Sequence, residues 1–258
     1  ELVDVARAIM TTDTFPKMAT REVQLTSGPV RVAGFCKGAG MICPDMATML
    51  GFILTDAGVD PDWWQAALTR CVAKSFNAIT VDGDTSTNDC VIALANGAGP
   101  TAGPEDVAVL EDAMLEVCQD LAYKVVQDAE GGTKVMRIHV QGALTVSDAE
   151  LAARAVGNSP LVKTALYGRD PNWGRIVAAL GRSGAVFQPE AVVVCIAGMT
   201  IFQQGTPVKA DWDSLLASAL RRDSVDISVE LGAGKEQTTL WASDFTEEYI
   251  KINAEYRT

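Results

Sequence analysis

Thr48 stands between a proline-bearing loop and an apolar run, in the stretch MICPDMATML of residues 41–50. A threonine hydroxyl becomes a useful nucleophile only when a base removes its proton. The only histidine of the sequence, His139, lies in a strand-like alternating stretch, where a structural role is more common. The threonine's own α-amine is another base, because its reference pKa is about 7.7 to 8.0. That amine exists only if the chain is cut directly before Thr48.

The residues before Thr48 suit such a cut. The hydroxyl can attack the preceding carbonyl, the acyl group shifts from nitrogen to oxygen, and water then hydrolyses the ester. This chemistry needs a small preceding residue and a rigid loop, which Ala47 and Pro44 supply. We expect Thr48 to begin a buried strand, so that a rigid element fixes its position. A threonine at a strand start is more often just a good strand former.

Other patterns that carry chemistry are weak. No cluster of histidine, cysteine and carboxylate has metal-ligand spacing, so no metal is expected. GAGK at 232–235 lacks the rest of a phosphate-binding loop. ANGAGPTAG at 95–103 matches a dinucleotide fingerprint but is interrupted by turns, and a turn is the better interpretation. DGDTSTND at 82–89 lacks the sixth-position glycine and distal glutamate of a calcium loop. Its Asp and Thr side chains are expected to hydrogen-bond the backbone near Thr48.

Composition indicates a globular protein of the cytoplasm. The chain has 258 residues, 48% of them hydrophobic, and a formal net charge of -12. This charge disfavours nucleic acids and anionic membranes as partners. Neither an apolar transmembrane run nor a signal pattern is found. The six cysteines lack CxxC spacing and are expected to be reduced, buried thiols.

The hydrophobic pattern predicts strands and helices that mix without strict alternation, so we expect an α/β or α+β layered sandwich. The strand at 48–57 is nearly all apolar, which predicts burial on both faces. Further strands are predicted at 30–35, 77–83, 90–97, 134–142, 191–198, 226–231 and 238–243. Helices are predicted at 62–76, 103–132, 149–157 and 212–222, the third opened by a capping box at 147–150. Asp170 and Asn172 are expected to cap a further helix around Pro171.

Longer motifs carry a resemblance. AIMTTDTFPK, KGAGMICPDMATML, SFNAITVDGDTSTND, DAEGGTK, SPLVKTALYGRDPNWGRI and INAEYRT follow one another along nearly the whole chain. Together they closely resemble the ornithine acetyltransferase family, the bifunctional glutamate N-acetyltransferases of arginine biosynthesis. The resemblance implies the DmpA/ArgJ-like fold, with mixed sheets flanked by helices.

The resemblance also implies a precursor that cleaves itself between Ala47 and Thr48. Residues 1–47 would then be the C-terminal part of an α subunit, and residues 48–258 a β subunit. Thr48 would take the acetyl group of N2-acetylornithine and pass it to glutamate, with acetyl-CoA as a further possible donor. No bound cofactor is implied, and the αβ pieces are expected to assemble as a heterotetramer.

Position-wise matching to the family implies the substrate-binding residues, which are Lys37, Thr48, Glu130, Asn253, Thr258 and a threonine of MTTDT, Thr11 in preference to Thr12. A cation such as Lys37 could hold a substrate carboxylate in an acidic protein, and Glu130 could pair with the ornithine ammonium. Without the resemblance, Lys37 is equally a solvated strand-end lysine and Glu130 a loop acid.

Two rival interpretations stay open. One is an N-terminal-nucleophile aminopeptidase of related fold, whose nucleophile is normally serine. The other is an inactive fragment, because the sequence starts at Glu1. The family's N-terminal α-subunit region, with the Thr-Gly pair of its oxyanion hole, is expected upstream of residue 1. The loss of one oxyanion donor can lower the rate by about 10²- to 10³-fold.

Overall fold

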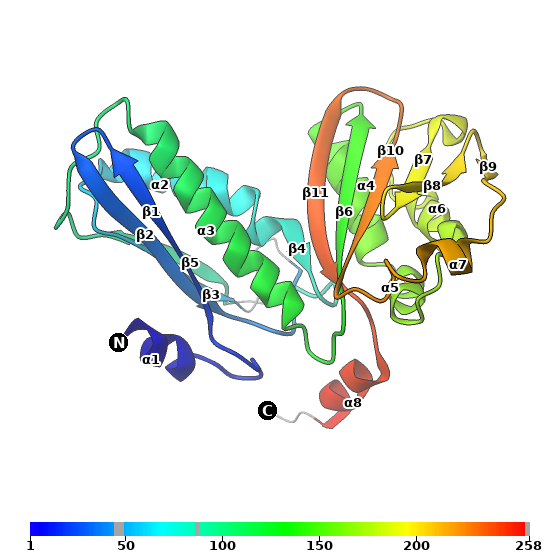
Figure 1. The fold of residues 1–258 in the computed structure, drawn as a ribbon, viewed down its shortest axis with the longest axis horizontal. Coiled ribbons are helices and arrows are strands. Elements are labelled where there is room, and N and C mark those ends of the chain that lie inside the picture. The colour runs from blue at the N-terminus through cyan, green and yellow to red at the C-terminus, as the bar shows by residue number, and fades with distance from the viewer. Residues whose placement is uncertain (44–48, 86–87, 256–258) are drawn as a thin grey trace. The chain divides into compact units, whose positions relative to one another are not determined.

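Figure 1 shows the computed structural model, which describes residues 1–43, 49–85 and 88–255. The chain divides into two compact units, Glu1–Asp128 and Ala129–Thr258. This division concerns packing, so the expected cleavage boundary after residue 47 stays a prediction.

The first unit pairs its strands in the order β1-β2-β3-β5. β1–β2 and β2–β3 are antiparallel, and β3–β5 is parallel. The long helix α3 lies across β1 and β2 (Figure 1). The elements are α1 (Leu2–Ala8), β1 (Lys17–Leu25), β2 (Gly28–Lys37), β3 (Leu50–Thr55), α2 (Pro61–Ala73), the 3-10 turn η1 (Phe76–Ala78), β4 (Ile79–Thr80), β5 (Cys90–Ala95) and α3 (Val107–Gln127).

Strand β3 corrects the expectation of burial on both faces. Gly51, Ile53 and Thr55 are buried, whereas Leu50, Phe52 and Leu54 are only half-buried. Ile53 lies opposite Gly34 of β2, and Gly34 approaches Leu121 of α3 so closely that a Cβ there would lie 2.9 Å from Leu121 Cδ1. Helix α3 therefore covers the Ile53 face. An apolar sequence could not reveal that burial differs between the two faces.

The second unit has a mixed sheet whose strands follow the order β11-β6-β10-β7-β8-β9. β6 and β10 run parallel, and the other pairings are antiparallel. Helix α4 packs on β6 and β11. The elements are β6 (Val135–Ala143), α4 (Val146–Gly157), α5 (Pro160–Tyr167), α6 (Trp173–Gly181), η2 (Pro189–Ala191), β7 (Val193–Ile196), β8 (Met199–Gln203), β9 (Thr206–Pro207), α7 (Trp212–Leu216), β10 (Ser224–Glu230), β11 (Glu236–Ser243) and α8 (Glu247–Glu255).

Helix caps follow the local sequence in most places. Asp60 accepts a hydrogen bond from the Trp63 amide at the start of α2, as its position before Pro61 predicts. The predicted capping box at 147–150 is wrong, because α4 begins at Val146 and Thr145 is its N-cap. The Thr145 hydroxyl accepts the amide of Asp148, so the cap lies two residues before the predicted cap at Ser147. Strands β1, β8 and β9 and helices α5 and α8 were not predicted.

Candidate active site

Ala47, Thr48 and Thr258 lie outside the described residues. The chain on either side of residues 44–48 is described, and β3 begins at Leu50, two positions after Thr48. The described residues nearest to Thr48 are therefore those up to Cys43 and from Met49.

The loop that follows β4 binds the backbone on the N-terminal side of residues 44–48. Asp82 accepts hydrogen bonds from the amides of Met41 and Ile42, at 2.7 and 3.0 Å. The hydroxyl of Thr85 donates to the carbonyl oxygen of Cys43 at 2.8 Å. The prediction that this polar loop binds the neighbouring backbone is thus confirmed.

Asp89 binds the backbone on the C-terminal side of residues 44–48. Its Oδ1 accepts the amide N–H of Met49 at 2.7 Å, and its buried Oδ2 has no hydrogen-bond partner among the described residues. Burial raises the pKa of Asp89, against the Met49 hydrogen bond and the nearby Lys37 charge, which lower it. Asp89 thus holds the amide of the residue that follows Thr48 in the sequence, and its second carboxylate oxygen is unpaired among the described residues.

Thr11 and Lys37, the candidates of the first unit, are linked through Asp13. The amide of Thr11 donates to Asp13 Oδ2 at 3.1 Å, and the amide of Gly38 donates to Asp13 Oδ1 at 2.7 Å. Lys37 is half-buried at the end of β2, and Thr11 is exposed. The structure thus brings the two segments together by means of a residue that the sequence did not single out.

Asp13 belongs to a buried ionic cluster. Lys17 Nζ lies 2.6 Å from Asp13 Oδ1 and 2.5 Å from Asp128 Oδ2, and the three side chains are 0%, 1% and 2% exposed respectively. Asp128 also accepts the amide and hydroxyl of Thr14. Burial raises the pKa of Asp13, but the bonds from Gly38, Lys17 and Thr11 outweigh it and leave the pKa below its usual value. The spacing of four residues between Asp13 and Lys17 could have indicated an ion pair. Asp128 lies 111 positions from Lys17, so no local sequence pattern indicates its part in the cluster.

Glu130 and Asn253, the candidates of the second unit, are in direct contact. Asn253 Nδ2 donates to Glu130 Oε2 at 3.1 Å and to the carbonyl oxygen of Tyr249 at 3.1 Å. Glu130 is half-buried and Asn253 exposed, so both remain open to a ligand. A carboxylate and an amide oxygen can both accept hydrogen bonds from an ammonium group, the role expected of Glu130.

Gly131 lets helix α8 approach Glu130. Its φ is +66°, and an added Cβ would overlap the amide nitrogen of Tyr249 and lie 2.8 Å from the carbonyl carbon of Glu248. The carbonyl oxygen of Gly131 accepts the hydroxyl of Thr246 at 2.6 Å. A glycine is thus required at this contact.

Gly131→Ala is expected to displace α8 and separate Asn253 from Glu130. The positive φ and the clash together should lower the free energy of unfolding by about 1–3 kcal/mol. Thermal unfolding and the spacing of the two side chains in a crystal structure would measure this. Gly184→Ala is the control, because Gly184 also has a positive φ, +80°, but open space around a Cβ. Equal effects of the two substitutions would contradict the close-approach argument.

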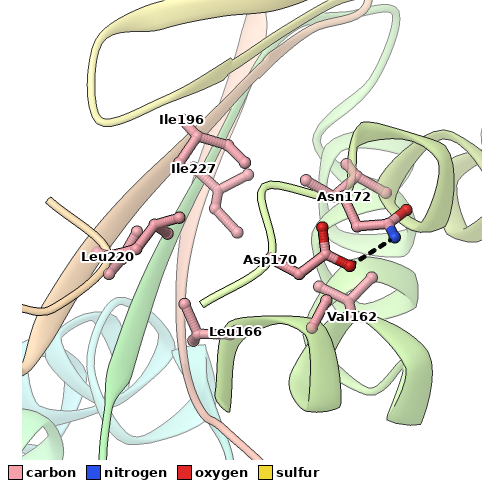
Figure 2. Close-up of a pocket in the computed structure, with 10 residues that line it drawn as sticks. Val162, Leu166, Asp170, Asn172, Ile196, Leu220 and Ile227 are labelled. Atoms are coloured by element: carbon pink, nitrogen blue, oxygen red, sulfur yellow. Dashed lines mark hydrogen bonds between the residues drawn. The ribbon is translucent and has the colours of Figure 1, made fainter. Parts of the chain in front are cut away.

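The motif GRDPNWGR has a structural role in this unit. Asn172 caps α6 by accepting the Arg175 amide, and its side-chain amide donates to Asp170 at 2.9 Å. Figure 2 shows this pair beside an apolar cavity lined by Val162, Leu166, Ile196, Leu220 and Ile227. The cavity of about 20 Å³ is large enough for a single water. It is therefore a packing gap and not a substrate site.

Histidine and cysteine do not form another site. His139 Nδ1 lies 3.0 Å from Thr239 Oγ1 on the neighbouring strand. The six cysteines form no disulfide bond, but Cys90 is exposed, so the expectation of uniform burial is wrong. Burial raises the pKa of the Cys36 thiol to about 12. Within residues 1–43, 49–85 and 88–255, no group of three His, Cys, Asp or Glu side chains is arranged to hold a metal ion.

Comparison with known proteins decides the family. The model of the ArgJ family matches residues 1–258. The chain belongs to the ArgJ family. It is 55% identical over 255 residues to the arginine biosynthesis bifunctional protein ArgJ of Nitratidesulfovibrio vulgaris, covering 98% of this chain and 65% of that protein. It is 45% identical to the mitochondrial ArgJ of Schizosaccharomyces japonicus, covering 98% of this chain and 60% of that protein. This ArgJ-family chain thus spans about three-fifths to two-thirds of the length of these relatives.

The fold of this ArgJ-family chain agrees with a solved relative. A crystal structure of ArgJ from Bacillus halodurans matches with a TM-score of 0.77 at 40% identity, covering 81% of this chain and 100% of the other. The predicted α/β fold with mixed sheets flanked by helices is thereby confirmed. In the described part, every helix is too short or too polar to cross a membrane.

Proposed function

We propose that the full-length protein transfers the acetyl group of N2-acetylornithine to glutamate, through an acetyl ester on Thr48. The observation that carries this proposal is the match of the whole chain to the ArgJ family. The curated relatives are named bifunctional proteins of arginine biosynthesis. Acetyl-CoA is a second donor in this proposal, and no resident cofactor is needed because the acetyl group is carried by Thr48.

The first step is cleavage of the Ala47–Thr48 bond. The Thr48 hydroxyl attacks the Ala47 carbonyl carbon, the C–N bond breaks as its nitrogen takes up a proton, and an ester forms. Water hydrolyses this ester to a carboxylate at Ala47 and a free hydroxyl on Thr48. Support comes from the hydrogen bonds that hold the backbone on both flanks, from the Met41 amide to Asp82 and from the Met49 amide to Asp89.

The second step moves the acetyl group. The neutral α-amine takes the Thr48 hydroxyl proton as the oxygen attacks the acetyl carbonyl carbon of N2-acetylornithine. The amide C–N bond breaks, and the ornithine nitrogen receives the proton. The neutral amine of glutamate then attacks the acetyl ester, which forms N-acetylglutamate and restores the hydroxyl. Each step conserves atoms and charge without an external reductant or oxidant.

The binding residues have complementary charges for this substrate. Lys37 offers a cation for the α-carboxylate, and the Glu130–Asn253 pair offers acceptors for the side-chain ammonium of ornithine. Thr11 and Thr258 complete the proposed set. The oxyanion donors are proposed to come from polypeptide outside residues 1–258, and the αβ pieces to form a heterotetramer.

Intact mass of the purified full-length protein tests the proposal first. Two chains, the second beginning at Thr48, are expected, and incubation with N2-acetylornithine should add one acetyl group to that second chain. Glutamate should then remove it as N-acetylglutamate. Hydrolysis of peptides without transfer to glutamate would favour the aminopeptidase. A single uncut chain without acetyl exchange would favour an inactive protein.

Asp89→Asn tests the electrostatics beside the new amine. The substitution keeps an acceptor for Met49 but removes a negative charge next to the proposed ammonium of Thr48. A nearby carboxylate favours the ammonium form and raises its pKa, so its loss should lower the amine pKa. The rising limb of the pH profile of kcat/KM is expected to move to lower pH by about one unit. Asp84→Asn, an exposed acid of the same loop, should leave the limb in place. If the rising limb of the Asp89→Asn profile stays at the wild-type pH, Asp89 does not raise the pKa of the amine.

A further inference from the structure

The cluster of Lys17, Asp13 and Asp128 has more negative charge than its buried cation requires. Lys17 is fully buried, and Asp128 alone would neutralise it at 2.5 Å. Asp13 adds a second carboxylate that is 8% exposed as a residue. Burial of an unbalanced charge is unfavourable unless hydrogen bonds compensate it. The groups that Asp13 binds in addition to Lys17 therefore indicate the role of Asp13.

Asp13 uses its two oxygens to hold two separate backbone segments. Oδ2 accepts the amide of Thr11, and Oδ1 accepts the amide of Gly38. Two amides bonded to one carboxylate lie within about 8 Å of each other. Gly38 follows Lys37 directly and has φ +148°, a conformation that favours glycine. The carboxylate thus fixes the chain at Thr11 and at the residue after Lys37.

We propose that Asp13 is a positioning residue for acetylornithine binding, which sets the spacing between Thr11 and Lys37 by holding the amides of Thr11 and Gly38. This inference rests on the proposed function. Asp13 itself touches no substrate in this scheme. Its hydrogen bonds reach the segments of Thr11 and Lys37, whereas Asp82 and Asp89 bind Met41, Ile42 and Met49 without involving Asp13. Binding should therefore depend on Asp13, whereas self-cleavage should not.

The same unit contains a matched acid away from these segments. Asp106 is 4% exposed and accepts the amide of Thr26 at 2.8 Å and the amide of Gly103 at 3.0 Å. It also accepts the hydroxyl of Thr26 at 2.8 Å. Like Asp13, it joins two distant segments by two backbone amides. Asp106→Asn therefore removes comparable structure without involving Thr11 or Lys37.

The test compares Asp13→Asn with Asp106→Asn in the full-length protein. An asparagine has one acceptor oxygen, so one of the two amides loses its partner, while Lys17 keeps its pair with Asp128. For Asp13→Asn, we expect KM for N2-acetylornithine to rise by about 10- to 100-fold, with kcat within about threefold. Self-cleavage, measured by intact mass, should be complete. Asp106→Asn should show a similar fall in Tm but an unchanged KM.

Each outcome has one meaning. Equal KM values for the two variants, with active wild type, would overturn the role of Asp13 and leave the proposed function standing. Wild type that transfers no acetyl group would refute the proposed function, and this inference with it. Should Asp13→Asn fail to fold, Asp13→Glu keeps the charge and moves the oxygens by one methylene. A raised KM in that variant supports the inference, and a wild-type KM overturns it.

Discussion

Thr48→Ala is expected to abolish both self-cleavage and acetyl transfer in the full-length protein. The substitution removes the oxygen that attacks Ala47 and later carries the acetyl group. Loss of a nucleophile can lower kcat by about 10⁶-fold in a hydrolase, and we expect a fall of at least about 10³-fold here. Intact mass should show one uncut chain, and assays with N2-acetylornithine and glutamate should give no N-acetylglutamate above background.

Thr48→Ser is the matched variant. It retains the hydroxyl and the α-amine but lacks the β-methyl group that restricts χ1. Cleavage and transfer should survive at a reduced rate. Should the alanine variant still be cut before residue 48 and transfer acetyl groups, the covalent route through this residue would be refuted.

Lys17→Met should destabilise the protein more than any surface substitution. It leaves the buried carboxylates of Asp13 and Asp128 facing one another without a cation. Breaking a buried ion pair by removing one partner costs about 3–5 kcal/mol of unfolding free energy. Urea unfolding would measure the loss. Arg31→Met is the control, because Arg31 and Glu22 form a solvent-screened pair with side chains 62% and 74% exposed, whose loss should hardly change stability.

The loss of stability in Lys17→Met should also depend on pH. The pKa of Asp13 in the folded protein lies below its ordinary value of 3.8. A lowered pKa gives stability that is fully present above the unfolded value and is lost as pH falls through the folded value. The stability difference between wild type and Lys17→Met should therefore be constant above about pH 5 and shrink below about pH 4. A difference that stays constant down to pH 3 would show that the charge of the cluster does not matter.

The sequence determined the features that depend on neighbouring residues. Caps and periodicity predicted α2, α3 and α6, because a cap is formed by side chains three residues away. Ordered motifs predicted the family, and the small residue before Thr48 made a self-cleavage site a reasonable hypothesis. The polar loop at 82–89 was correctly expected to bind backbone groups.

Only the tertiary structure decided which distant residues meet. Glu130 and Asn253 are 123 positions apart, and Asp128 reaches Lys17 across 111. Single side-chain hydrogen bonds of this kind leave no periodic signal in the sequence, because they depend on the path of the whole chain. The half-exposed face of β3 has the same origin, since its apolar residues look alike until α3 packs on one side. Asp13 emerged as a site residue for that reason, through contacts with backbone amides that any residue type could supply.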